Sequence, residues 1–460
     1  MAGEGATGAK IRWKASNPSW SAKADLRKEF LISRSRLVSF QMRRSLATPL
    51  EHRQMQRIVV LGAGFAGLWA ALAAARARGE AAMGAADLDI TVLDANTHHS
   101  IRVRNYESSL AETWIPLNTV LDPVDVGHIQ AEVSGIDVNA RTVACVSGGK
   151  SQSIPYDRLV VALGSRLARP PIPGLAEHAF DVDTYAAGER LNRHIAGLAD
   201  LPPTDGQYTV LVVGAGLTGI EVATDIATRF QSTAPSSLRP RVVLADHKPW
   251  IGSDMGDSAR PVIAQALEAL GVETLPGVSV AGVDESGATL SDGTRIPART
   301  VIWCAGMKAN PFAATLPVEL DRLGRIPVDS YLRVVSIPGV FAAGDIAALS
   351  VDGTHSSVMS CQHSRPMGRF AGHNAVADLL GRPMLSLQIP WYTTILDLGG
   401  WGAVYTEGWD RRVAATGAAA KRTKELINRQ RIYPPLNGDR KALLDAAEPV
   451  VQTAPPRFSA

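Results

Sequence analysis

The sequence predicts an α/β protein built from two similar units, each a strand, a glycine turn, a helix and a second strand. Three observations predict this fold class. The chain has 460 residues, 46% hydrophobic and 20% charged, which suits a folded protein of about three domains or sub-domains. A glycine-rich segment after a β-branched strand occurs twice, at 57–67 and 209–219. Each copy is followed, at the same distance, by an apolar strand that ends in aspartate.

Composition and charge exclude several classes of protein. Three cysteines cannot staple a chain of this length, which excludes a disulfide scaffold. The net charge of +3 is unevenly spread, because residues 1–55 hold eleven Lys or Arg against four Asp or Glu. The rest of the chain is mildly acidic, so the composition does not indicate nucleic-acid binding. The longest apolar run, 58–75, contains three glycines, which predicts a strand-to-helix unit and not a membrane span.

Residues 1–54 form a basic extension that is rich in Ser and Arg. We expect this stretch to be disordered, or to lie upstream of a true start at Met55. A transit peptide is the alternative that its composition allows. No secretory signal is predicted, because no apolar core follows the basic residues.

The two glycine-rich segments superimpose with an offset of 152 residues. The first glycine of such a segment makes the tight turn, the second lets the backbone approach a pyrophosphate, and the third lets helix and strand pack closely. The helix N-terminus attracts phosphate, and the acid on the next strand binds ribose hydroxyls. Two such sites predict two Rossmann-like domains that hold two dinucleotides, of which FAD and NAD(P)H are the natural pair. The offset aligns Gly62 with Gly214, Gly64 with Gly216, Gly67 with Gly219 and Asp94 with Asp246.

Three later segments complete an ordered series of motifs. Apolar strands end at Gly164-Ser165, at Gly306 and at Gly344-Asp345. With the two glycine loops, this series resembles the two-dinucleotide-binding-domain flavoproteins of the pyridine nucleotide-disulfide oxidoreductase superfamily. Within them it is most similar to type II NADH dehydrogenases and apoptosis-inducing-factor-like quinone reductases. The resemblance implies an FAD domain split as 55–170 and 305–385, with an NAD(P)H domain inserted at 171–304.

The resemblance also implies roles for individual residues. The backbone of Val133 would meet the adenine, Asp345 a ribityl hydroxyl, and Arg102 the N1/C2 region of the flavin. Asp246 favours NADH, because a carboxylate repels the 2′-phosphate of NADPH, although Lys248 partly offsets that repulsion. The residues expected to bind the two cofactors are therefore Gly62, Gly64, Gly67, Asp94, Arg102, Val133, Gly164, Gly214, Gly216, Gly219, Asp246, Gly306, Gly344 and Asp345.

Two departures from the family pattern concern the electron acceptor. Cys145, Cys304 and Cys361 are far apart in sequence and form no short-spaced pair, so the acceptor must take electrons directly from the flavin. The Gln pair that type II enzymes carry at their quinone site falls here on Pro366-Met367. Gln362, which matches the upstream Gln, and the adjacent His363 remain as candidates for contact with the acceptor.

Glu221 stands two residues past the third glycine of the second copy, where the first copy has Trp69. The resemblance places Glu221 at the junction of nicotinamide and flavin, with a catalytic role. No metal site is predicted, because His98-His99 has no Cys or Asp partner at ligand spacing.

The C-terminal part is predicted to add a hairpin and a helix over 386–435, followed by a polar tail over 436–460. Trp and Tyr flank strand-like runs around Gly399-Gly400, which indicates a hairpin. Residues 410–432 carry seven Lys or Arg against two Asp or Glu. We expect there a solvated helix that covers the acceptor site, since a membrane-surface helix, the alternative, needs a stronger apolar face.

Taken together, these patterns predict an FAD-dependent NAD(P)H oxidoreductase that passes hydride from NADH to flavin and electrons to a quinone-like acceptor. Two alternatives stay open: reduction of a small redox protein, and a non-enzymatic NAD(P)H sensor. We expect a cytoplasmic protein; the sequence leaves open a peripheral contact with the inner face of the membrane and indicates no oligomeric state.

Overall fold

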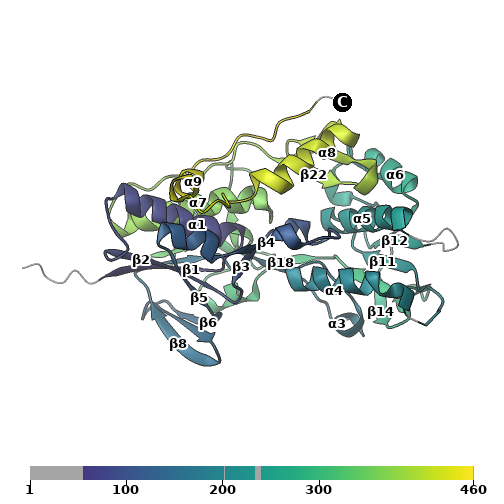
Figure 1. The fold of residues 1–460 in the computed structure, drawn as a ribbon, viewed down its shortest axis with the longest axis horizontal. Coiled ribbons are helices and arrows are strands. Elements are labelled where there is room, and N and C mark those ends of the chain that lie inside the picture. Colours follow the sequence, from purple (N-terminus) through teal and green to yellow (C-terminus); the bar gives the residue numbers. More distant parts are fainter. Residues whose placement is uncertain (1–54, 201, 234–239, 459–460) are drawn as a thin grey trace, which may run out of the picture. The chain divides into compact units, whose positions relative to one another are not determined.

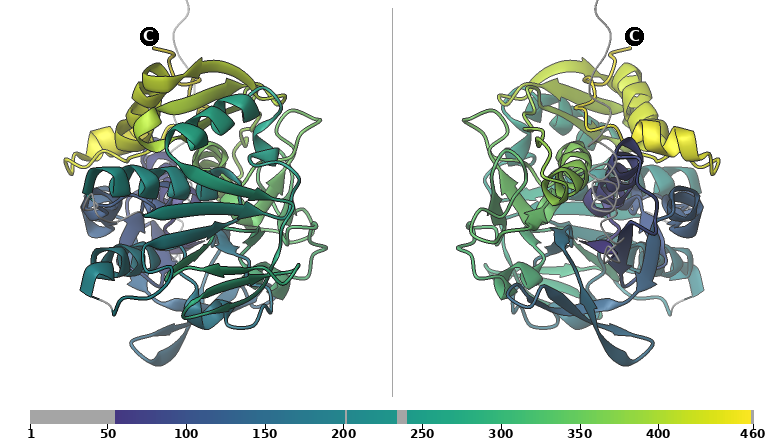
Figure 2. Two further views of the ribbon diagram at one scale, coloured as in Figure 1. Left: turned by 90° about the vertical axis from the view of Figure 1, so that its right-hand side faces the viewer. Right: turned by 90° about the vertical axis from the view of Figure 1, so that its left-hand side faces the viewer.

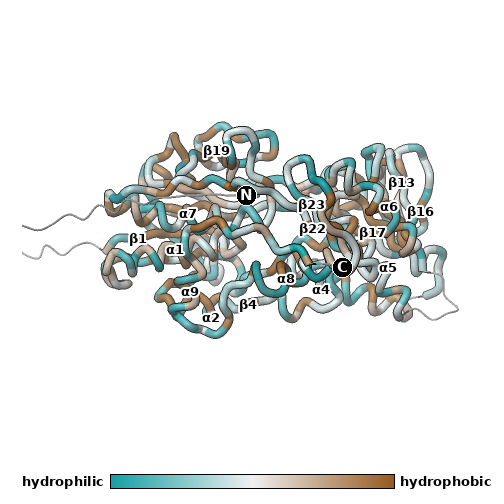
Figure 3. Tube along the Cα trace, turned by 90° about the horizontal axis from the view of Figure 1, so that it is seen from above, coloured by the Kyte–Doolittle hydropathy of each residue, from teal (hydrophilic) through white to brown (hydrophobic). Residues whose placement is uncertain are grey.

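The first sheet is formed by parallel strands from distant parts of the chain. The computed structural model describes residues 55–200, 202–233 and 240–458, and the predicted extension 1–54 lies outside them. Residues 58–61 are fully buried, as expected for parallel strands covered on both faces, and Figure 3 shows this stretch as hydrophobic. In spatial order the strands are β20 (Val340–Ala342), β9 (Arg158–Val161), β1 (Gln56–Leu61), β2 (Leu88–Asp94) and β5 (Gly127–Gln130).

Helices α1 (Phe65–Glu80) and α7 (Cys361–Leu379) pack against each other beside this sheet (Figure 1). They approach closely because α7 presents two glycines, one turn apart, to the backbone of α1. A Cβ atom at Gly368 would lie 2.2 Å from the Ala66 carbonyl oxygen, and one at Gly372 would lie 2.0 Å from that of Ala70. Neither position has room for a side chain, so these glycines set the distance between the helices.

The second sheet repeats this design. Helices α5 (Leu217–Thr233) and α6 (Arg260–Ala269) follow its first two strands in the chain. Smaller elements, α3 (Leu175–His178), α4 (Tyr185–Ala196) and an antiparallel sheet of β14 (Val280–Asp284), β15 (Gly287–Leu290) and β16 (Arg295–Pro297), complete this half. The parallel order is β13 (Val272–Pro276), β12 (Arg241–Asp246), β11 (Thr209–Val213) and β17 (Thr300–Trp303).

The strand registers confirm that the two halves are copies of one unit. Arg57 pairs with Asp89 across β1 and β2. The residues 152 positions later, Thr209 and Arg241, pair in the same way across β11 and β12. The α/β fold with two doubly wound parallel sheets is therefore as the sequence predicts.

Two antiparallel strands connect the halves. The chain leaves the first sheet after β9 through β10 (Ser165–Leu167) and returns after β17 through β18 (Met307–Ala309), which pairs with β10. The predicted domain borders, 170/171 and 304/305, fall next to these strands and stay a prediction.

Shorter elements of the first half are β3 (His98–Ser100) with β4 (Trp114–Pro116), β19 (Ile326–Val328) with β21 (Ala347–Leu349), α2 (Asn118–Leu121), and a sheet of β6 (Glu132–Asp137), β7 (Thr142–Ser147) and β8 (Lys150–Pro155).

The C-terminal segment lies over helices of both halves, with β22 against α5 and α9 against α1 (Figure 2). The predicted hairpin is confirmed as β22 (Thr393–Asp397) and β23 (Ala403–Glu407), but a third strand, β24 (Arg412–Thr416), extends it. The predicted basic helix starts later than expected, as α8 (Gly417–Leu426), and continues into one π-helical turn (Ile427–Arg431).

The last residues differ from the plain polar tail that the sequence predicts. They contain α9 (Arg440–Ala446), whose Leu443 is fully buried. The extended residues after it remain attached to the body, since Thr423 Oγ1 donates to the Pro456 carbonyl at 3.0 Å and Arg457 pairs with Glu407. Within the described ranges, no helix has both the length and the apolar character needed to cross a membrane.

Candidate functional site

The first glycine loop, between β1 and α1, has the geometry of an anion cradle. Gly62 has φ +94°, and a Cβ atom there would lie 2.6 Å from the Ala162 carbonyl oxygen. A Cβ atom at Gly67 would lie 1.7 Å from the Gly62 carbonyl oxygen, whereas one at Gly64 would meet no atom within 4 Å. The first and third glycines are thus required by the fold, and the second faces open space at the start of α1, where a phosphate can approach.

The second loop, between β11 and α5, repeats these features. Gly214 has φ +103°, and a Cβ atom there would lie 2.8 Å from Ala305. A Cβ atom at Gly219 would lie 1.7 Å from the Gly214 carbonyl oxygen, and one at Gly216 would again meet no atom within 4 Å. Both loops therefore offer the same cradle.

Each predicted acid folds back onto its own loop. Asp94 Oδ2 accepts a hydrogen bond from the Ala63 amide at 2.6 Å. Asp246 Oδ2 accepts one from the Ala215 amide at 2.5 Å, and its Oδ1 accepts one from the Lys248 amide at 2.7 Å. Both carboxylates are thereby fixed at the carboxyl end of a strand, beside the open glycine.

A cleft of about 880 Å³, which we call the dinucleotide cleft, opens beside the first loop. Its volume falls in the range of about 300–1,000 Å³ that cofactor sites occupy. Six of the residues predicted to bind a cofactor line this cleft: Gly62, Gly64, Asp94, Arg102, Val133 and Gly164. The structure thus brings together residues that the sequence separates by 102 positions, and the cleft suits an extended dinucleotide.

Asp345 is held by hydroxyl groups from two other segments. Its Oδ2 accepts from Ser165 Oγ at 2.6 Å, and its Oδ1 accepts from Ser364 Oγ at 3.1 Å. Arg102 donates to the same Ser165 Oγ at 2.9 Å and forms an ion pair with Asp183. Position 344 requires glycine for two reasons: its φ is +78°, and a Cβ atom there would lie 2.6 Å from Ala66. Gly306 has φ +80° and lies between β17 and β18, directly before β18.

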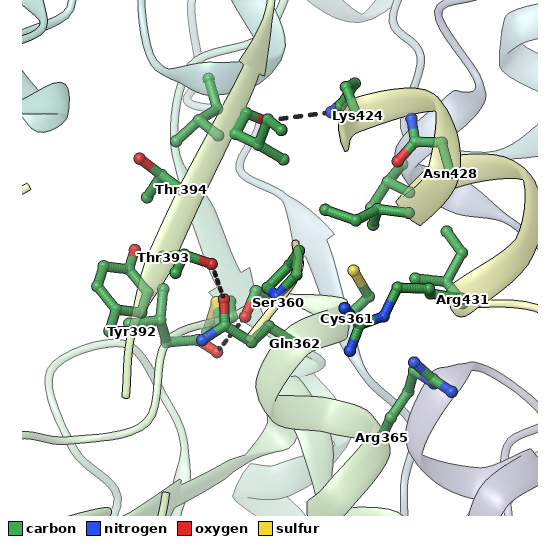
Figure 4. Close-up of a pocket in the computed structure, with 18 of the residues that line it drawn as sticks. Ser360, Cys361, Gln362, Arg365, Tyr392, Thr393, Thr394, Lys424, Asn428 and Arg431 are labelled. Carbon is green, nitrogen blue, oxygen red and sulfur yellow. Dashed lines mark hydrogen bonds between the residues drawn. The ribbon is translucent and has the colours of Figure 1, made fainter. Parts of the chain in front are cut away.

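A second, smaller cavity of about 290 Å³ lies where the two halves and the C-terminal segment meet; we call it the junction cavity. Arg102 lines both this cavity and the dinucleotide cleft. Glu221 lines it from α5, and Gln362 lines it from the first turn of α7. Figure 4 shows Gln362 beside Thr393 of β22, with Lys424 and Asn428 on the opposite side. The cavity is therefore lined by two of the three residues, Glu221 and Gln362, that the sequence assigns a catalytic role.

Glu221 forms a buried ion pair that the sequence does not predict. Lys424 Nζ donates to Glu221 Oε1 at 2.7 Å, and each side chain is only 8% exposed. Burial raises the pKa of Glu221 and Lys424 opposes that rise. Burial by itself would lower the pKa of Lys424, but Glu221 and Asp397 raise it above its usual value. Lys424 therefore stays charged and fixes the carboxylate of Glu221 at the wall of the cavity.

A second ion pair docks the same helix, because Lys421 of α8 pairs with Asp397 at 2.6 Å. The basic residues at 410–432 indicate a helix, but only the tertiary structure shows that two of its lysines face acids of the protein. A spacing of three residues between Lys421 and Lys424 is the one signal in the sequence that places both on one helix face.

Gln362 and His363 are placed differently. Gln362 lines the cavity, and its amide lies 3.4 Å from both the Trp391 carbonyl oxygen and Thr393 Oγ1. His363 is fully buried behind the cavity wall, where its Nδ1 accepts a hydrogen bond from the Val358 amide at 2.7 Å. Burial lowers the pKa of His363 to about 4. This histidine does not line the cavity, so the structure gives it no direct path to an acceptor there.

The free thiols lie apart in the structure as well. Cys145 is buried in the first half, and burial raises the pKa of Cys304. Cys361 lines the junction cavity at the start of α7, and burial raises its pKa too. Across the described part of the chain, no group of His, Cys, Asp and Glu side chains is arranged to hold a metal ion.

Comparisons with known proteins show the family to which this chain belongs. Residues 56–368 match the pyridine nucleotide-disulphide oxidoreductase family. An NADH dehydrogenase-like protein of Mycobacterium tuberculosis is 56% identical over 403 residues, which are 87% of this chain and 100% of that protein. A type II NADH:quinone oxidoreductase of the same species is 32% identical over 64% of this chain and 67% of that protein. The solved structure of NDH2 from Plasmodium falciparum in complex with NADH has a TM-score of 0.69 at 13% identity, covers 86% of this chain and 98% of its own, and supports the fold alone.

Proposed function

Since this chain belongs to the pyridine nucleotide-disulphide oxidoreductase family, we propose that it is an FAD-dependent enzyme that oxidises NADH and reduces a quinone. The net reaction is NADH + H⁺ + quinone → NAD⁺ + hydroquinone, so that two electrons are transferred and the second proton comes from water. FAD, when bound, supplies the electron carrier between the two substrates.

The residues that would hold each group follow from the two cradles. The open backbone at Gly64, with Asp94 and Asp345, suits the pyrophosphate, the adenosine ribose and the ribityl chain of FAD. Gly216 and Asp246 suit the corresponding parts of NADH. Asp246 also disfavours a 2′-phosphate by charge repulsion.

One observation carries this proposal: the junction cavity is lined by Arg102 from the first half, by Glu221 from the second, and by Gln362. A flat acceptor in this cavity would be adjacent to both dinucleotide sites. Activity as an NADH:quinone oxidoreductase in the type II relatives supports the choice of substrates. Peripheral contact with a membrane stays an untested alternative.

Anaerobic stopped-flow absorbance tests the proposal. We expect NADH to bleach the flavin of the purified enzyme faster than NADPH does, and a short-chain quinone to restore its colour faster than oxygen does. Gln362→Ala should slow the quinone step about ten-fold and leave reduction by NADH unaffected. The matched control is Gln430→Ala, at an exposed glutamine of the π-helical turn. If no quinone reoxidises the reduced enzyme faster than oxygen does, the quinone assignment is contradicted.

A further inference from the structure

The junction cavity contains an arginine cluster that the proposed reaction leaves unexplained. Arg365 and Arg369 are one turn apart on α7, and Arg431 lies in the π-helical turn after α8; all three line the cavity. Arg365 is 6% exposed and Arg369 is 2% exposed. Figure 4 shows the side chains of Arg365 and Arg431 reaching the same part of the cavity from these two elements.

These three arginines form no ion pair with a described residue, in contrast to the other cations of the cavity. The charge of Glu448 does act on Arg369, where it opposes the lowering of the pKa by burial. Arg102 pairs with Asp183 and Lys424 pairs with Glu221. Arg365 donates instead to the neutral amide of Gln452 at 2.9 Å, and Arg431 donates to the Thr453 carbonyl oxygen at 2.5 Å. Among all lining residues, five cationic side chains face one carboxylate, that of Glu221.

Arg369 makes neither a hydrogen bond nor an ion pair with any described residue. It lies over the ring of Trp69 with its guanidinium carbon 4.3 Å from the ring centroid, and that of Arg365 lies 4.9 Å from the same centroid. The Nε atoms of both arginines are buried without a hydrogen-bond partner. Burial, and then the charge of Arg369, lower the pKa of Arg365 to about 9. Buried charges without a partner are costly, and an anion between these groups would remove that cost.

The remaining lining suits a flat apolar body. Ile389, Ile395 and Trp391 lie on one side, and Met359 and Ile427 also line the cavity. Pro366, which lies between Arg365 and Arg369 on α7, also lines the cavity and adds apolar surface beside these cations.

We propose that the junction cavity binds an acceptor whose flat ring carries a compact anionic group, a carboxylate or a sulfonate, held by Arg365, Arg369 and Arg431. This inference rests on the proposed function and narrows its substrate class: the acceptor is an anionic quinone. Its ring gains two electrons and two protons to become the hydroquinone, and the anionic group is unchanged by the reaction.

A matched pair of quinones tests this selectivity on the holoenzyme. The ratio of kcat/KM for 1,4-naphthoquinone-2-sulfonate to that for 1,4-naphthoquinone is measured with NADH in excess. Arg365→Gln and Arg431→Gln should each lower this ratio about ten-fold. The control Arg412→Gln, at an arginine whose side chain is 83% exposed, should leave the ratio unchanged. If the arginine variants leave the ratio unchanged as well, the anionic acceptor is refuted while the quinone reductase stands.

Calorimetric titration provides a readout that does not depend on turnover. Naphthalene-2-sulfonate should bind the oxidised holoenzyme about ten-fold more tightly than the neutral naphthalene-2-sulfonamide, and Arg365→Gln should remove that difference. If the sulfonate binds selectively but no quinone reoxidises the enzyme, the proposed function is refuted and the anion site stands. Equal binding of the two naphthalenes refutes the anion site. Inorganic phosphate is the third probe, and binding of phosphate as tight as that of the sulfonate shows a site for free anions and refutes the proposal.

Discussion

The two copies of the dinucleotide unit have the same loop but differ in what covers the helix that follows it. In both copies the third glycine packs against the carbonyl group of the first. A Cβ atom on the third glycine would lie 1.7 Å from that carbonyl oxygen in each copy. Two residues later the first copy has Trp69 and the second has Glu221. Trp69 lies under the two arginines of α7, and Glu221 lies under Lys424 of α8. The repeated motif therefore determines the backbone of the loop and helix. The element packed over the helix accounts for the different side chain, Trp69 or Glu221, at the equivalent position.

The two elements that cover these helices, α7 over α1 and the C-terminal hairpin over α5, both approach through glycines. Gly368 and Gly372 let α7 approach α1, and Gly399, with φ +57°, lets the hairpin turn approach α5. A Cβ atom at Gly399 would lie 2.4 Å from the Thr224 carbonyl oxygen. Each covering then brings cations to the equivalent position of its helix. The charge of the junction cavity thus comes from segments outside the duplicated units.

The largest expected effect comes from breaking either copy at its third glycine. Gly67→Ala and Gly219→Ala each force a Cβ atom against a backbone oxygen, so we expect a loss of more than about 4 kcal/mol in the free energy of unfolding. Gly67→Ala should also lose FAD, whereas any folded Gly219→Ala should keep FAD and lose NADH binding. Urea unfolding and flavin content measure both effects. Gly64→Ala, where a Cβ atom meets nothing, should fold normally; wild-type stability of Gly67→Ala would contradict the close packing.

Lys424→Met tests the covering of the second copy. It leaves the Glu221 carboxylate buried without a charged partner, only the Asp397 amide still donating to it, which costs about 3–5 kcal/mol of unfolding free energy. Glu221→Gln combined with Lys424→Met should recover most of that loss, because no uncompensated charge then remains. The control is Lys441→Met, which removes a side chain that is 85% exposed and paired within α9 and should cost about 0.5 kcal/mol or less. Additive losses in the double variant would mean that the two side chains do not interact.

Variants of Asp94 and Asp246 should affect different cofactors, FAD for the first and the nicotinamide dinucleotide for the second. Asp246→Ser removes the carboxylate that repels a 2′-phosphate, so kcat/KM for NADPH should rise relative to NADH by about ten-fold, or 1.4 kcal/mol. Asp94→Ser should weaken FAD retention and leave that ratio unchanged. Steady-state kinetics with both nucleotides, on FAD-saturated protein, gives the comparison. A ratio that shifts in Asp94→Ser and not in Asp246→Ser would reverse the assignment of the two cradles.

The last expected effect is a dependence of stability on pH that arises in the first copy. Burial lowers the pKa of His99 to about 4, although its ring hydrogen bond to the Ala63 carbonyl opposes this. The unfolded chain protonates this histidine below about pH 6.5 while the folded protein does not, so stability falls as the pH drops towards 4, by about 1.4 kcal/mol per pH unit. His99→Asn should make this slope shallower by that amount, as measured by urea unfolding between about pH 7 and pH 5. His247→Asn, at an exposed histidine of the second copy, is the control and should keep the wild-type slope.

Sequence alone determines the duplicated part of this protein. Gly67 and Asp94 act through residues of the same unit, so their spacing carries their signal. Gly62 is found by the same spacing, although the atom that limits its side chain belongs to Ala162. The β-branched strands before each loop are local patterns as well, and the family motifs add the order of the segments. For these reasons the amino-acid sequence is enough to predict the fold class and six of the residues that line the dinucleotide cleft.

Tertiary structure alone decides the chemistry of the junction cavity. The pair of Glu221 and Lys424 joins residues 203 positions apart, and no local pattern links them. His363 and Arg365 are two positions apart in one helix, yet the first is enclosed behind the wall and the second faces the cavity. Which side of α7 meets the cavity depends on the close contact of its glycines with α1 and on the C-terminal segment above it. Burial and charge balance are properties of that assembly, so the sequence supplies the arginines and only the packing leaves them without an ion pair.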